Sequence, residues 1–312
     1  MRETDIENLL LKGFQDELKN KNNSYLYQLF MIGMRCLKPD SNGGNRINFN
    51  RYSEELKLWR QYRIGENCAL NSFVIKKNRS NLFDSSSFIR ALPIFLSNQD
   101  LNIAISESFK ISYYITEDID TFFFTIINGI ILMEYMNEND IIQIYNILKD
   151  RLISIPSIDY IRKIKREEDK LYIIRFEDMR IKTIQILDRL ISEDMSIVNY
   201  LKAILENLFS DKIDKKVMNK IEYIYKNDIV IDNSYIRNIG SYIYKLRMGR
   251  ISPRSLKFVK KKDKSIYDMA EGERFNSSIL GNSYLSKIER RNNREIRYVV
   301  SKSGKYKFIR EI

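Results

Sequence analysis

The side chains available for chemistry are restricted, because the chain of 312 residues contains no histidine and only two cysteines, Cys36 and Cys68. The lack of histidine excludes Ser-His and Cys-His nucleophilic pairs, histidine general bases and histidine-ligated metals. Two cysteines are too few for a cysteine-ligated zinc site or a disulfide framework, so we interpret both as buried thiols. Hydrolytic chemistry would have to use carboxylates, tyrosine, lysine or a metal held by oxygen ligands.

One group of carboxylates stands directly before an apolar segment. Glu117, Asp118 and Asp120 precede the segment 121–136, which is apolar nearly all round and therefore reads as a central helix. Acidic side chains are stabilised at the positive end of a helix. We therefore interpret this group as an acidic helix start.

Apolar residues recur at helical spacing through most of the chain. The predicted helices cover residues 5–18, 25–37, 52–62, 101–115, 121–136, 141–152, 171–191, 196–209 and 235–248. The segment 38–46 has the composition of a turn. We expect an all-α, compact multi-helix domain over residues 1–251.

The end of the chain has a different period. Residues 294–312 alternate apolar and polar side chains on both sides of Lys302-Ser303-Gly304, which predicts a β-hairpin with glycine in the turn. Residues 260–286 are polar and irregular, and we expect loops there. Residues 252–312 are thus predicted to form an appendage that carries a small hairpin.

The net charge of +12 is concentrated in this appendage, where sixteen Lys and Arg stand against seven Asp and Glu, a net +9. Such asymmetry favours an acidic partner, either a protein or a nucleic acid, although the whole chain is rich in lysine. The alternative is a hairpin with one face packed on the helical body and Lys and Arg protecting its edge. The candidate contact residues are Arg294, Arg297, Tyr298, Lys302, Lys305, Tyr306, Lys307 and Arg310.

No apolar run approaches the roughly 18 residues that cross a bilayer. The first residues, MRETDIENLL, are acidic where a signal peptide is basic and then apolar. We expect a cytoplasmic protein with no membrane partner.

Several motifs resemble those of the ADP-ribosylglycohydrolase family, the group that includes dinitrogenase-reductase-activating glycohydrolase. Arg90 and Pro93 match the family's N-G-[SA]-x-M-R-x-x-P segment, and Ser108 and Thr116 match its later S-x-x-T-H segment. Glu117 stands in place of that histidine. Ser85 and Ser86 stand in place of the family's asparagine and glycine.

Weaker similarities extend over residues 5–251 in the family's order. Asp16 and Leu18 match the opening helix, Trp59 and Gly65 match a helix and the glycine turn after it, and residues 231–251 resemble the D-x-D-T segment with its following helix. The resemblance implies the family's helical fold and an ADP-ribose-like ligand.

The resemblance fails at the metal ligands. The family holds two magnesium ions with a T-D-D run and the D-x-D-T run, and hard Mg²⁺ ions close together need several carboxylates. The first run corresponds here to Asn22, Asn23 and Ser24, and the second corresponds to Asp232, Asn233, Ser234 and Tyr235. Asp232 is the one remaining metal candidate, and a weak one. Asp118, Asp120 and Thr121 also spell D-x-D-T, but their spacing favours the helix start described above.

Three functions remain open. The first is a non-catalytic binding or adaptor protein that needs no cofactor, and the second is an active magnesium-dependent ADP-ribosyl hydrolase with a rearranged site. The third is nucleic-acid binding through the appendage. Arg90 is either a ligand contact or half of a buried pair with a carboxylate. The vestigial cleft would be lined by Asn22, Asn23, Ser85, Ser86, Arg90, Glu117, Asp232 and Ser234.

Overall fold

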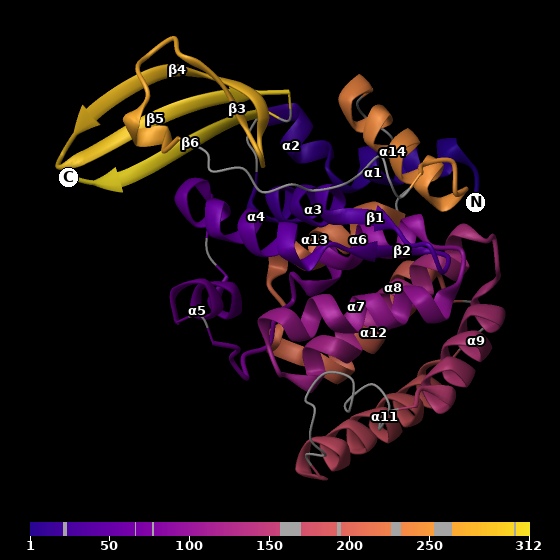
Figure 1. The fold of residues 1–312 in the computed structure, drawn as a ribbon. Helices are drawn as coiled ribbons and strands as arrows, with labels where there is room; N and C mark the ends of the chain where they lie inside the picture. The colour runs from indigo at the N-terminus through magenta and orange to yellow at the C-terminus, as the bar shows by residue number, and fades with distance from the viewer. Residues whose placement is uncertain are drawn as a thin grey trace.

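The computed structural model describes residues 1–20, 24–65, 67–76, 78–156, 170–191, 195–225, 232–252, 264–302 and 304–312. They form a mostly helical body with a small antiparallel sheet at the C-terminal end of the chain (Figure 1). The expectation of a helical domain followed by a β-containing appendage is confirmed at this level.

The first half of the body is built from α1 and α2, which a break at Phe14 separates, and from α3 to α7. The bounds are α1 Glu3–Gly13, α2 Gln15–Asn20, α3 Tyr25–Cys36, α4 Phe49–Tyr62, α5 Cys68–Lys76, α6 Ser87–Ser97 and α7 Leu101–Ile115. The turn expected at 38–46 joins two short strands, β1 Leu37–Pro39 and β2 Asn45–Ile47. The helix predicted over 101–115 coincides with α7.

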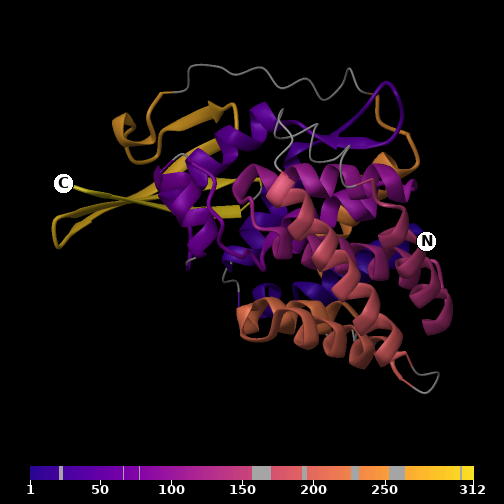
Figure 2. The same cartoon turned by 90° about the horizontal axis from the view of Figure 1, so that it is seen from below.

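The second half contributes α8 Ile119–Met136, α9 Ile141–Ser154, α11 Lys170–Leu190, α12 Ile197–Phe209, α13 Lys215–Tyr225 and α14 Ser234–Arg247. Helices α9 and α11 lie side by side along one flank of the body (Figures 1 and 2). The helices α5, α6 and α13 were not among the predicted elements, although α6 is buried along its whole length.

Helix α8 is the centre of the core and packs against α6, α7, α9, α11 and α12. Gly129 of α8 faces the Phe95 ring of α6, where a Cβ atom would overlap that ring. Helix α8 is long and apolar enough to cross a membrane, but 89% of it is buried inside the body. It is therefore the central helix expected from its sequence, but the expectation that no segment approaches the length of a membrane span is wrong for residues 119–136.

The two cysteines differ in environment. Cys36 is buried at the end of α3, whereas Cys68 is exposed at the first turn of α5. The expectation of two buried thiols is wrong for Cys68, because α5 lies at the surface and buries Ala69 and Leu70 instead.

The C-terminal sheet has the order β3-β4-β5-β6, all antiparallel, with β3 Arg274–Ser277, β4 Gly281–Arg291, β5 Arg294–Ser301 and β6 Gly304–Glu311. The predicted hairpin is confirmed as β5 and β6, joined where Gly304 has φ +135°. Loops were the wrong expectation for 274–277 and 281–286. Much of β4 is polar and exposed, so its composition resembles that of a loop.

One face of the sheet packs on the body through α4. The Tyr62 ring meets the rings of Tyr306 and Phe308 at centroid distances of 4.8 and 5.6 Å. Arg35 of α3 donates a hydrogen bond of 3.1 Å to the Tyr306 hydroxyl. The sheet is thus attached by β6 and extends sideways from the helices (Figures 1 and 2).

Candidate functional site

A network of buried polar side chains surrounds the start of α6. The Asp84 carboxylate forms an ion pair with Arg90, and neither side chain has any exposed surface. The same carboxylate accepts hydrogen bonds from the Ser86 backbone N–H (3.0 Å), the Ser86 hydroxyl (2.6 Å) and the Asn67 amide (2.9 Å). We call Asn67, Asp84, Ser86 and Arg90 the α6 network.

The local sequence explains this arrangement. Ser86 is the N-cap of α6, so Asp84 stands at the helix end where a negative charge is stabilised. Arg90 lies one turn later and reaches back to it. Burial opposes the charge of Arg90 and is the largest single influence on it, but Asp84 and Tyr52 together outweigh burial and raise the pKa of the guanidinium. The interpretation of Arg90 as half of a buried pair therefore describes what the structure shows.

Ser85 joins this region to the starts of α3 and α13. Its hydroxyl accepts a hydrogen bond of 3.3 Å from the backbone N–H of Asp214. The Asp214 carboxylate accepts a 2.5 Å hydrogen bond from the Tyr25 hydroxyl. Burial and then the Asp214 carboxylate raise the pKa of Tyr25 well above its ordinary value. Two of the motif segments, at the starts of α3 and α6, are therefore neighbours.

Ser24, at the position of the family's second aspartate, is fully engaged in local contacts. It caps α3 by accepting from the Tyr27 N–H (3.2 Å) and donates a 2.5 Å hydrogen bond to Glu17. Glu17 in turn pairs with the buried Lys220 of α13 at 2.5 Å. Through Ser24, Glu17 and Lys220, the start of α3 is thus connected to α2 and α13.

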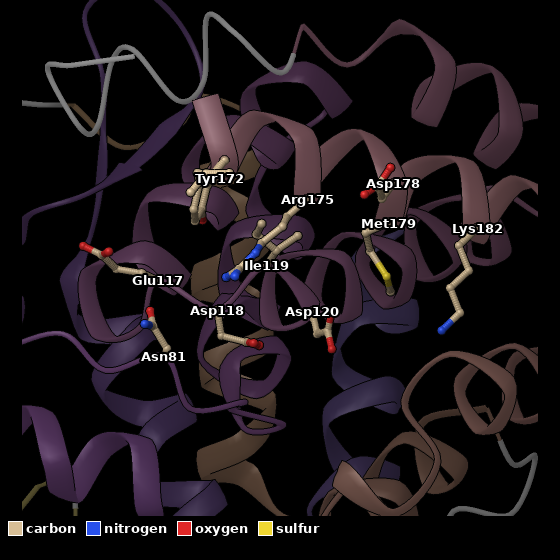
Figure 3. Close-up of a pocket in the computed structure, with 11 residues that line it drawn as sticks. Asn81, Glu117, Asp118, Ile119, Asp120, Tyr172, Arg175, Asp178, Met179 and Lys182 are labelled. Carbon is tan, nitrogen blue, oxygen red and sulfur yellow. The ribbon is translucent and has the colours of Figure 1, made fainter. Parts of the chain in front are cut away.

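A cavity of about 590 Å³ opens between the start of α8 and helix α11. Figure 3 shows the acidic side chains of the α8 start on one side and the side chains of α11 on the other, with Arg175 reaching toward α8. We call it the α8 cavity. Its lining residues are Asn81, Glu117, Asp118, Ile119, Asp120, Leu171, Tyr172, Arg175, Asp178, Met179 and Lys182.

The acidic residues of this cavity form the helix start that the sequence predicted. Asp118 is the N-cap of α8 and accepts 2.8 Å hydrogen bonds from the Thr121 N–H and hydroxyl. Burial raises the pKa of Asp118, although the hydrogen bonds from Thr121 act in the opposite direction. Asp120 pairs with Lys212 at 2.5 Å, and Glu117 accepts a 3.2 Å hydrogen bond from Tyr113.

Thr121 connects the α8 cavity with the α6 network. Its hydroxyl accepts a 2.8 Å hydrogen bond from the Asp84 backbone N–H while it donates to Asp118. A change in the cavity wall would therefore reach the buried ion pair through one side chain.

The predicted cleft residues do not form a single site. Ser85, Ser86 and Arg90 lie together but are buried, and Glu117 lines the neighbouring cavity. Asp232 and Ser234 lie at the exposed start of α14, and Asn22 and Asn23 fall outside the described residues.

The described residues do not fit a two-magnesium site. The Asp232 side chain is 74% exposed and pairs with Arg237 at 2.5 Å, so a guanidinium already occupies the one matched carboxylate. Arg237 also bridges to Glu7 of α1 at 3.1 Å. Ser24, its counterpart at the other run, already donates its hydroxyl proton to Glu17.

The predicted contact residues of the appendage are divided between the two faces of the sheet. Arg297 is 5% exposed and donates to Glu295 and to the backbone carbonyls of Ile266 and Met269, so it braces the sheet. Tyr306 packs on the body as described. Arg310 pairs with Glu295 at 2.6 Å on the same face.

The remaining predicted contacts are elsewhere. Lys302 lies at the β5–β6 turn, and the alternation of each strand places Arg294, Tyr298, Lys305 and Lys307 on the opposite face. The alternative of a hairpin with one face packed on the body matches the structure.

Asp84, Asp214 and Glu17 had no predicted role, and Thr121 was considered only as the last residue of the D-x-D-T segment. An aspartate just before a helix start was a readable capping signal for Asp84. Asp214 lies far from Tyr25 and Ser85 in sequence, and no local pattern indicates such a contact.

Comparison of the chain with models of protein families, with curated proteins and with solved structures finds no match in any of the three. The similarity to ADP-ribosylglycohydrolases therefore rests on the sequence motifs described above.

Proposed function

We propose that the protein is a non-catalytic binding or adaptor protein, built on a scaffold that resembles an ADP-ribosylglycohydrolase. The proposal is supported by the contact between the motif segments at the starts of α3 and α6, which Tyr25, Asp214 and Ser85 bring together. A shared scaffold requires these segments to be neighbours, although they are about 60 residues apart in sequence.

The observation that carries the non-catalytic part is the engagement of the matched polar groups. Arg90 is closed inside the α6 network, and Asp232 is held by Arg237. A hydrolytic site needs a carboxylate that is free to orient a water or a metal ion. Each of these charges is instead paired with another protein charge, Arg90 with Asp84 and Asp232 with Arg237.

The α8 cavity is the part of this region that is open to a ligand, and its size lies within the roughly 300–1,000 Å³ of small-molecule sites. It carries charges of both signs, with Glu117 and Asp118 on the side of α8 and Arg175, Asp178 and Lys182 on α11. An ADP-ribosylated arginine also carries both, as a guanidinium and a pyrophosphate. We therefore assign this modified side chain to the cavity as the ligand that its charges suit best.

Calorimetry with an ADP-ribosylated arginine peptide tests the assignment, with the unmodified peptide and free ADP-ribose as comparisons. Replacing Arg175→Glu is expected to weaken binding of the modified peptide by roughly tenfold or more, because a charge-assisted contact to the pyrophosphate is lost. Arg189→Glu on the same helix, outside the cavity, is the matched control. Equal affinities for both variants would contradict the assignment.

A hydrolysis assay on the same peptide, with and without magnesium, tests the non-catalytic part. We expect no release of ADP-ribose. Turnover that disappears in Asp232→Ala but persists in Asp211→Ala, which removes an exposed acid elsewhere, would establish the alternative of an active hydrolase instead.

A further inference from the structure

The C-terminal sheet has a second face, turned away from α4. Alternation along β5 and β6 places Arg297, Val299, Tyr306 and Phe308 against the body, so their sequence neighbours point the other way. We call this second side the outer face. Its central residues are Arg274, Tyr284, Lys287, Ile296, Tyr298, Val300, Lys305, Lys307 and Ile309.

A β-bulge sets the pattern on β4. The register shifts between Leu285 and Lys287, so Tyr284 pairs with Val300 and Lys287 pairs with Tyr298. In a regular strand residues 284 and 287 would point to opposite faces, and the bulge brings both to the outer face. The outer face thereby gains an aromatic ring and a cation side by side on one strand.

The register arranges these residues in two cross-strand rows. One row runs Lys287, Tyr298 and Lys307 across β4, β5 and β6. The adjacent row runs Arg274, Tyr284, Val300 and Lys305 across all four strands. Each row has a tyrosine within it and a basic residue at each end.

The outer face is open. Tyr284 and Ile309 each keep 42% of their surface exposed, which is high for large apolar side chains. A groove of about 470 Å³ crosses the face, and the sheet around it extends sideways from the body (Figure 1). The lining residues of this groove are Tyr284, Ser286, Lys287, Glu289, Tyr298, Val300 and Lys305.

The charge of the outer face is positive. Lys287 pairs with Glu289 at 2.7 Å, which neutralises one end of the first row. Within the described part of the chain Arg274, Lys305 and Lys307 take part in no ion pair. The open cations therefore lie along both edge strands, with the tyrosines between them.

We propose that the outer face binds a single-stranded nucleic acid, with two bases stacked on Tyr284 and Tyr298 and with phosphates held by Arg274, Lys305 and Lys307. The two tyrosines are diagonal neighbours on adjacent strands, about 7–8 Å apart by the geometry of antiparallel sheets. Aromatic side chains on an open sheet face accept unpaired bases, and flanking cations follow the backbone.

The other occupants fit less well. An acidic protein segment would use the cations but has no need of two tyrosine rings on adjacent strands between them. A second copy of this chain would bring a face of the same positive charge and would be repelled. This inference does not depend on the function proposed for the α8 cavity, because it uses different residues.

Fluorescence anisotropy of the full-length protein with a labelled oligouridylate and a labelled oligothymidylate tests the proposal. Tyr284→Ala and Tyr298→Ala are each expected to weaken binding by roughly five- to a hundredfold, and the corresponding Tyr→Phe variants are expected to retain it. If the Tyr→Phe variants still bind the oligonucleotides, the loss in the Tyr→Ala variants is due to the missing ring and not to the missing hydroxyl. Circular dichroism of each variant checks that the sheet is intact.

A second arm measures the electrostatic contribution. Lys305→Glu with Lys307→Glu should weaken binding and lower the slope of log affinity against log salt by about 0.7 for each phosphate contact that is lost. The control is Lys215→Glu with Lys216→Glu, at two exposed positions on α13, which changes the net charge by the same amount. The affinity and the salt slope of this variant should stay close to those of the unchanged protein.

Three results would overturn the proposal. The first is no oligonucleotide binding by the unchanged protein. The second is equal weakening by the α13 control, which would indicate a diffuse charge effect. The third is binding of polyglutamate as tight as that of the oligonucleotides and unaffected by either Tyr→Ala variant, which would assign the face to an acidic protein instead.

Discussion

Replacing Asp84→Asn in the α6 network removes one charge and changes the shape of the side chain very little. The amide oxygen can still accept from Ser86 or Asn67, but Arg90 is left without its counter-charge. Because neither Asp84 nor Arg90 reaches solvent, water cannot compensate. The native state is destabilised by an uncompensated buried cation.

The magnitude follows from this burial. Removing one partner of a buried ion pair destabilises a protein by about 3–5 kcal/mol. Since the amide of the variant retains an acceptor, we expect the lower end, about 3 kcal/mol, which is a large part of the roughly 5–15 kcal/mol that stabilises a typical domain.

Urea unfolding followed by circular dichroism measures this loss as a lower midpoint at an unchanged slope. Asp188→Asn is the matched control, because Asp188 pairs with Lys149 at 2.8 Å but its side chain is 44% exposed. Its effect should be far smaller, since solvent screens an exposed pair. Adding Arg90→Met to Asp84→Asn should restore part of the lost stability by removing the stranded charge. Equal losses for Asp84→Asn and Asp188→Asn would refute the reasoning.

Two further predictions concern helix α8. Gly129→Ala should lower the free energy of unfolding by about 1–3 kcal/mol, because the new methyl group overlaps the Phe95 ring. Adding Phe95→Leu to this variant should restore part of the lost free energy in the same urea assay. Asp118→Asn tests a pH dependence. The raised pKa of Asp118 means that this carboxyl binds a proton more tightly in the folded state than in the unfolded state. Asp118 therefore stabilises the fold at pH values below its unfolded pKa. This stabilisation is lost as the pH rises through the folded pKa. The melting temperature of the variant should therefore rise relative to the unchanged protein as pH increases above about 4, the unfolded pKa, and a difference that stays flat would contradict the assignment.

The helices were predictable where their apolar periodicity is strong. Helix α7 has the predicted bounds, and α8 begins two residues earlier than predicted because its N-cap is Asp118. Helix α6 was missed although all of its residues are buried, because a short segment that is apolar nearly all round and contains Pro93 shows no helical period. Helices α5 and α13 were missed because they are short. Local patterns thus identified most of the core helices but not α6, which packs on α3, α7 and α8.

The sheet and the polar network show where sequence reasoning ends. The hairpin of residues 294–312 was predictable because one of its faces is buried, so apolar and polar residues alternate along both strands. Apolar and polar residues do not alternate regularly along β4, because a bulge interrupts the strand and its outer side chains are polar or exposed. The Asp214 contacts depend on tertiary placement, which no spacing in the sequence encodes.

The position of α1 has a consequence for biosynthesis. Its buried face packs on α13 and α14, where Gly240 lies against Glu7. Those helices follow about 200 residues later in the chain. At roughly 5–20 residues per second, a ribosome takes on the order of 10–40 s to deliver them. During that interval the apolar side of α1 lacks its two main native partners, so it stays exposed or is buried by transient local contacts until the last helices emerge.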